Sequence, residues 1–160
     1  ILDADRTRKH LAGRLAMDAV REPFLEGMYS EDMTTTVYQE LFRRANIVLG
    51  SGRPVIVDAS FRKAAERAAV QELARRCKVP FYFVECRATA DVCRNRLVER
   101  AKGVSVSDGR LELFDAFAAS FEEVTELEHA EHVVLDTTQE PETNLNELRR
   151  RVGFRPLPPE

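Results

Sequence analysis

The chain has 160 residues, of which 44% are hydrophobic and 32% are charged, and its formal net charge is −3. This length suits a single domain with a sizeable core. The small net charge excludes recruitment of nucleic acid or an acidic membrane by the field of the whole molecule. No apolar run approaches the roughly 18 residues that a membrane-spanning helix needs.

The three cysteines, Cys77, Cys86 and Cys93, are odd in number and lack the spacing of a metal site. Each is interpreted as lying in an apolar context, so we expect reduced thiols in the core of a cytoplasmic protein. The first residue is Ile1 rather than methionine, and we expect that the chain has lost its natural start.

Residues 1–3 are typical of the end of a strand, and a helix that carries Leu11 follows them. Asp5 could cap this helix, or it could face a substrate from the carboxyl end of the strand. Asp5 and Arg8 are three residues apart and share a face of the first helical turn. Residues 13–29, called the substrate rim below, are irregular; they could line an active site or simply connect two elements.

A long helix is predicted over residues 30–49, with Ser30 as its N-cap. Apolar residues recur on one face at helical spacing, which indicates a core-facing helix. They are Met33, Val37, Leu41, Ala45 and Val48.

The stretch that organises the chain is the strand predicted over residues 54–58. Val55, Ile56 and Val57 form an unbroken β-branched run, which favours a strand covered on both faces, as in a parallel sheet. The run ends at Asp58. Ligands of open α/β sheets bind at the carboxyl ends of the strands, so Asp58 could belong to a site; it could equally cap the next helix.

That next helix is predicted over residues 63–77. Its expected apolar stripe consists of Ala65, Ala69, Leu73 and Cys77. Arg62, Lys63 and Arg67 cluster near its start, where the helix dipole disfavours cations. The cluster indicates either an anionic partner or a solvated face.

Two further strands are predicted over residues 81–85 and 132–136, and further helices over 111–121 and 145–152. Between them, a helix capped by Thr89 carries Arg96 and Arg100, which share a face. These arginines precede a polar, glycine-containing loop, so they could clamp a phosphate. Alternatively they pair with Glu99 and Asp108 on the surface. Residues 100–109 are called the lid, and we expect a disordered tail at 156–160.

Strands that alternate with helices indicate an α/β domain with a mainly parallel sheet. Six motifs occur in order: Asp5-x-x-Arg8, Val-Ile-Val-Asp-Ala-Ser (55–60), Phe-Val-Glu-Cys-Arg-Ala (83–88), Arg-Leu-x-x-Arg-Ala (96–101), Val-Ser-Asp (106–108) and Val-Val-Leu-Asp-Thr (133–137). Over residues 1–140 the chain resembles the small P-loop kinases of the gluconate-kinase-like group. It is most similar to the ATP-binding domain that accompanies aminoglycoside-phosphotransferase-like proteins.

The resemblance implies a three-layer α/β/α P-loop NTPase-like domain over residues 1–155. It implies transfer of a phosphoryl group from ATP and Mg²⁺ to a hydroxyl of a small molecule, which is chemistry of positioning and charge neutralisation. By resemblance, Asp5 would accept the hydroxyl proton, and Arg8 would hold the substrate or the γ-phosphate. Asp58 would hold Mg²⁺ through water or orient the substrate.

The resemblance also assigns residues on the nucleotide side. Arg96 and Arg100 would be lid arginines over the transferred phosphoryl group, and Thr137 and Thr138 would lie on the adenine side. The Gly-rich loop with Lys and Ser or Thr that wraps the phosphates is missing from the 160 residues. We expect it, with its strand and helix, before Ile1.

Two alternatives stay open. A polynucleotide 5'-hydroxyl kinase would need a basic channel, but the substrate rim offers only Arg14 and Arg21 against Asp18, Glu22 and Glu26, so nucleic acid is the less favoured partner. A nucleotide-binding regulatory module, attached to an upstream domain, is the other alternative.

Overall fold

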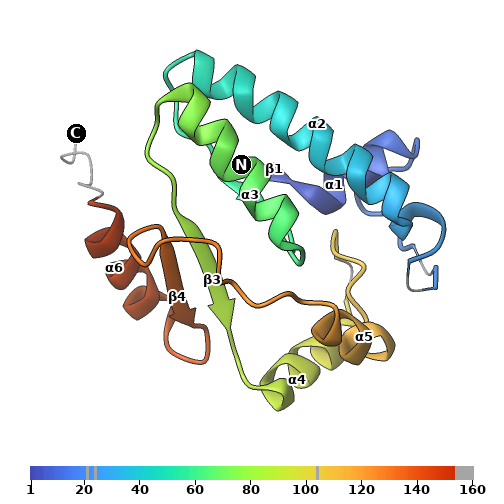
Figure 1. Cartoon of the computed structure of the whole chain (residues 1–160). Coiled ribbons are helices and arrows are strands. Elements are labelled where there is room, and N and C mark those ends of the chain that lie inside the picture. Colours follow the sequence, from blue (N-terminus) through green and yellow to red (C-terminus); the bar gives the residue numbers. More distant parts are fainter. Residues whose placement is uncertain (21, 24, 104, 154–160) are drawn as a thin grey trace, which may run out of the picture.

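The computed structural model describes residues 1–20, 22–23, 25–103 and 105–153. Helices and short strands alternate along the chain (Figure 1). The strands are β1 (Leu2–Asp3), β2 (Val57–Asp58), β3 (Phe83–Arg87) and β4 (His132–Asp136), and the helices are α1 (Ala4–Leu11), α2 (Glu31–Gly50), α3 (Ala64–Cys77), α4 (Ala90–Arg100), α5 (Phe114–Ala119) and α6 (Pro141–Val152). The tail predicted at 156–160 lies outside the described residues.

The strands form two parallel pairs. β1 pairs with β2, and Asp3 lies opposite Asp58. β3 pairs with β4 over five residues, from Phe83 opposite His132 to Arg87 opposite Asp136. Among the described residues no strand joins the two pairs. The α/β class with parallel strands agrees with the sequence analysis, but the single continuous sheet does not.

The strand predicted over residues 54–58 is regular only at β2. Ile56 is 63% exposed, so the expectation that both faces of this run are covered is wrong. Successive strand residues point to opposite faces. Val57 packs against the core, whereas the described helices leave the face of Ile56 open.

The core lies between α2, α3 and the strands. Its buried cluster consists of Val37, Tyr38, Leu41, Phe61 and Phe83. The predicted helix caps are confirmed, because the Ser30 hydroxyl accepts from the Met33 N–H and the Thr89 hydroxyl accepts from the Val92 N–H. The apolar face predicted for α2 is confirmed at its centre, where Val37 is fully buried.

The face of α3 that meets the core differs from the prediction. Ala65 and Ala69 are exposed, and Arg67 is fully buried instead. Its guanidinium donates to Glu126, to the Phe61 carbonyl at 2.9 Å and to the Glu123 carbonyl at 3.2 Å. These acceptors satisfy the buried cation, which explains why an arginine can occupy a core position.

The basic cluster at the start of α3 therefore has protein partners. Lys63 pairs with Glu31 at 2.8 Å, Arg67 pairs with Glu126, and the Arg62 guanidinium donates to the Ser120 hydroxyl. The suggested anionic partner for this cluster is not needed to account for these charges.

Replacing Arg67 by methionine is expected to lower the free energy of unfolding by about 3 kcal/mol, the low end for breaking a buried ion pair, because Glu126 stays partly exposed. Urea unfolding measures the change. The control is Arg75→Met on the same helix, where Arg75 pairs with Glu72 at the surface. Loss of this exposed ion pair should lower the free energy of unfolding by at most about 1 kcal/mol. Equal unfolding midpoints for both variants would contradict the role given to Arg67.

The cysteines are free but lie outside the core. Cys77 and Cys93 are partly buried and Cys86 is exposed, so the expectation of core thiols is wrong. Cys86 lies on β3, which pairs only with β4 among the described residues. Within the described part of the chain, no helix is long and apolar enough to cross a membrane.

Candidate active site

Two acidic side chains lie at one edge of the β1–β2 pair. β2 ends at Asp58, opposite Asp3 at the end of β1, and the strands run parallel. Asp5 follows at once, in the first turn of α1. The structure thus places Asp5 and Asp58 at the carboxyl edge of the same pair, which is where α/β folds bind ligands.

The N-cap of α1 is Asp3, whose carboxylate accepts from the Arg6 N–H at 2.8 Å. The alternative in which Asp5 caps this helix is therefore wrong. The helix begins at Ala4, two residues earlier than that alternative requires, so Asp5 already lies inside the first turn. Its carboxylate is left for other contacts.

Asp5 has the environment of a carboxylate with altered basicity. Burial raises its pKa above the ordinary 3.8, and the charges of Asp108 and Asp3 act in the same direction. A hydrogen bond with the Ser107 side chain and the charge of Arg8 oppose the rise. A raised pKa moves a carboxylate towards the range in which general bases work.

Arg8 is 7% exposed and reaches from α1 into the substrate rim. Its guanidinium donates to the Met28 carbonyl at 2.6 Å and to the Thr34 hydroxyl at 3.3 Å, and it lies over the Tyr29 ring at 4.9 Å. Its Nε is buried, and the described residues give it no hydrogen-bond partner. Arg8 therefore anchors the rim beside Asp5, and its Nε–H has no acceptor among the described residues.

Asp58, at the end of β2, lies near enough to β3 for its charge to act there. It is exposed, and after burial its charge is the largest contributor to the raised pKa of the Cys86 thiol on β3. The described residues contain no group of three or more side chains suited to hold a metal ion. Mg²⁺ commonly binds through one or two carboxylates, substrate phosphates and water, and a lone exposed Asp58 fits that kind of site.

The two arginines of α4 meet different parts of the molecule. Arg96 donates to the hydroxyl of Thr137 at 3.0 Å and also to its carbonyl. Arg100 lies one turn further on, where its Nη1 approaches Gly109 of the lid so closely that a side chain added at Gly109 would come within 3.4 Å. α4 thus connects the loop after β4 with the lid.

The surface partners suggested for these arginines are wrong. Glu99 pairs with Lys102 at 2.6 Å, and Asp108 pairs with Lys9 at 3.2 Å. Thr138 is engaged locally, because its hydroxyl and N–H both donate to Asp136. Of the predicted site residues, the structure therefore brings Arg96 to Thr137 and Asp5 to Arg8.

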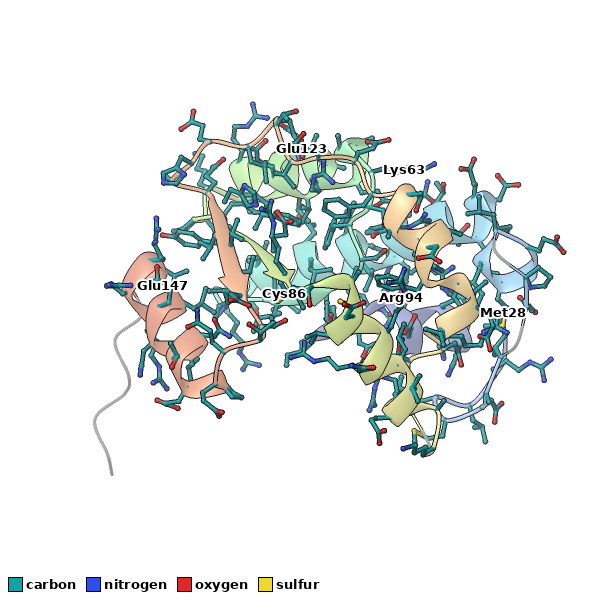
Figure 2. The ribbon with its side chains drawn as sticks, turned by 90° about the horizontal axis from the view of Figure 1, so that it is seen from below. Met28, Lys63, Cys86, Arg94, Glu123 and Glu147 are labelled. Atoms are coloured by element: carbon teal, nitrogen blue, oxygen red, sulfur yellow. The ribbon has the colours of Figure 1, made fainter. Side chains whose placement is uncertain are left out.

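Figure 2 shows the molecule with its side chains, from the substrate rim to α6. Met28, at the rim, and Glu147, on α6, mark opposite ends, and Arg94 lies on α4 between them. Four residues beside Asp5 were not predicted: Lys9, Tyr29, Ser107 and Asp108. They meet only through contacts between segments far apart in sequence, such as Lys9 and Val106, which are 97 positions apart, and no local pattern reports such contacts.

Parallel strands, carboxylates at their carboxyl ends and a following helix with arginines are features of a P-loop NTPase-like domain. The comparison with protein families agrees: the model of the AAA domain matches residues 1–124. The chain therefore belongs to this family, whose fold is P-loop NTPase-like and whose members have nucleotide-binding, kinase-like character.

Relatives occur among mycobacterial proteins. Proteins of Mycobacterium bovis and Mycobacterium tuberculosis, each described as uncharacterized, are 39% identical to the chain over 93 residues. The match covers 58% of this chain and 18% of each relative, so the chain spans less than a fifth of the proteins it resembles. No solved structure matches the chain.

Proposed function

We propose that this domain transfers a phosphoryl group from ATP to a hydroxyl of a small molecule. The observation that carries the proposal is the setting of Asp5. It is a partly buried carboxylate with a raised pKa, beside Arg8 and Ser107 of the lid. It also follows the carboxyl end of β1. A general base for a substrate hydroxyl needs this combination of basicity and placement.

In the proposed reaction Asp5 accepts the proton of the attacking hydroxyl, and Arg8 orients the acceptor or the γ-phosphate. Bound ATP with Mg²⁺ supplies the phosphoryl group and neutralises its charge. Asp58 would hold the metal through water. These roles rest on the resemblance and on the positions described above.

On the nucleotide side, Arg100 and Arg96 are the candidates for cations over the phosphates, because a guanidinium matches phosphoryl oxygens. The bond from Arg96 to Thr137 supports a link between the lid helix and the loop where the adenine would lie. Thr138, next to it, has its hydroxyl engaged with Asp136, so its backbone rather than its side chain is the candidate contact.

The phosphate-binding loop is not among the 160 residues. We propose that a strand carrying this loop pairs with the open edges of β2 and β3. The support is that each of these strands has a single partner among the described residues. An edge that pairs with no strand leaves a row of backbone N–H and C=O groups without a ladder partner.

A regulatory nucleotide-binding module is the second candidate. The specific observation in its favour is that the matched region makes up only 18% of each relative. A polynucleotide kinase is less favoured. Lys9, a cation beside the rim, is fully buried against Asp108, so it does not contribute to a basic channel for phosphates.

The test compares the 160-residue chain with a longer form of the protein that contains the Gly-rich loop. ATP labelled at the γ-phosphate and Mg²⁺ are supplied with sugars, amino alcohols and nucleosides as acceptors. We expect the longer form to bind ATP and to phosphorylate one class of hydroxyl. ATP binding without transfer to any acceptor would favour the regulatory module.

A further inference from the structure

One carboxylate joins the substrate rim to the lid. The side chain of Asp108 is only 5% exposed. Its Oδ1 accepts from the Val20 N–H at 3.1 Å, and its Oδ2 accepts from the Tyr29 hydroxyl at 2.7 Å. Val20 and Tyr29 both belong to the rim, whereas Asp108 belongs to the lid. A single side chain thus holds two separate points of the rim.

The partner of this carboxylate is equally buried. Lys9 on α1 is 0% exposed, and its ammonium lies 3.2 Å from Asp108 Oδ2. It also donates to the Ala16 carbonyl of the rim at 3.2 Å and to the Val106 carbonyl of the lid at 2.7 Å. All three N–H donors of the ammonium are therefore used, which is the condition under which a buried ion pair offsets its desolvation cost.

The same segment also reaches the candidate base and the far end of the rim. Ser107, next to Asp108, hydrogen-bonds to the Asp5 carboxylate. Arg110, two residues further on, donates to the Glu22 carbonyl. Displacing Asp108 would therefore move both the acceptor side of the site and the hydroxyl that contacts Asp5.

We propose that Asp108 is a positioning residue that couples the substrate rim to the lid, so that the two segments order and open as one unit over Asp5. Its significance for phosphoryl transfer rests on the function proposed above. The coupling itself is a property of the fold and can be measured without any turnover. Acceptor binding in the rim would then place the lid over the reacting groups, since the two share Lys9 and Asp108.

The first measurement is hydrogen–deuterium exchange on the full protein and on Asp108→Asn. The proposal expects amide exchange to become faster in both the rim and the lid by about tenfold or more, because bonds to a charged group are lost. The control is Asp115→Asn, which makes the same change in the exposed pair of Asp115 with Arg94 at 2.7 Å. Faster exchange in the lid alone, or in neither segment, overturns the coupling.

The second measurement is steady-state kinetics once an acceptor is known. In Asp108→Asn the KM for the acceptor should rise about tenfold or more, while the KM for ATP stays within about twofold. The fall in rate at low pH should occur at a lower pH in the variant. The Asp108 carboxylate raises the pKa of Asp5, whereas Ser107 and Arg8 lower it, so losing the Asp108 charge lowers the pKa of Asp5. Lys9, left without its counter-ion, acts in that same lowering direction. A merely structural change would alter neither the KM for the acceptor relative to the KM for ATP nor the pH at which the rate falls.

Asp108→Asn leaves a buried cation unpaired and could unfold the protein. Tyr29→Phe is the second variant, since it removes one bond to Asp108 and keeps the ion pair with Lys9. It should loosen both segments in the same exchange experiment, to a smaller extent. If the wild-type protein transfers phosphate to no acceptor, the proposed function fails, and the exchange data still decide whether Asp108 couples rim and lid.

Discussion

Replacing Asp5 by asparagine is expected to lower phosphoryl transfer by about 10²–10⁴-fold, the contribution of a general base. Asparagine has nearly the same shape and can still hydrogen-bond to Ser107, but it cannot accept the proton of the acceptor. The rate is measured with a true acceptor in a form of the protein that binds ATP. Transfer at the wild-type rate would exclude Asp5 as the base, and Asp58 at the same edge would become the candidate.

The stability of this variant separates chemistry from folding. Burial raises the pKa of Asp5, so its ionised form costs free energy in the folded state, and the neutral amide removes that cost. We expect the melting temperature to stay at or slightly above that of the wild type. Asp3→Ala is the matched control: it loses the cap on the Arg6 N–H, at about 1 kcal/mol of stability, and keeps the base.

The pH dependence has a definite sign. Below its folded-state pKa Asp5 is protonated and cannot accept a proton, so the rate falls as the pH falls through that value. Because the pKa of Asp5 lies above 3.8, the fall should begin at a higher pH than for an ordinary aspartate. The residual rate of Asp5→Asn should not show this fall. A pH–rate profile of the wild type and the variant measures the difference.

Replacing Arg100 by alanine is expected to lower turnover by about 10³-fold, as for an arginine that stabilises the charge of a transferring phosphoryl group. Arg100 is exposed at the end of α4, beside Gly109 of the lid, so its loss should change the unfolding free energy little. Arg94→Ala is the control on the same helix, because Arg94 pairs with Asp115 at the surface. Unchanged turnover in both Arg96→Ala and Arg100→Ala would remove these arginines from the proposed site.

Local chemistry was sufficient to predict much of the framework. β4 occupies residues 132–136 as predicted, because an apolar run bounded by turn residues has few alternatives. Ser30 and Thr89 cap their helices, since a hydroxyl beside free N–H groups acts over a few residues only. The alternation of these elements then indicates the α/β class.

Most of the failures depend on contacts made at long range. Arg67 was expected at the surface because arginine is rarely buried, and its acceptor Glu126 lies 59 residues away. Ile56 was expected to be buried because it lies in the apolar run 55–57. Whether it is buried depends on helices or strands from elsewhere in the fold, which the run cannot indicate. At the site, Asp5 and Arg8 were found from a short motif, whereas the pairing of Lys9 with Asp108 could not be predicted from the Val-Ser-Asp motif that contains Asp108.

The buried pair of Lys9 and Asp108 also has a consequence for the order of folding. Its bonds join residues separated by 97, 88 and 79 positions, and closing loops of that length costs entropy before any contact forms. The apolar cluster around Val37 and Leu41 can assemble from shorter separations. During synthesis on the ribosome, Lys9 emerges long before its counter-ion and stays hydrated until the segment around Asp108 has been made. The acceptor side therefore cannot mature until that segment has been made.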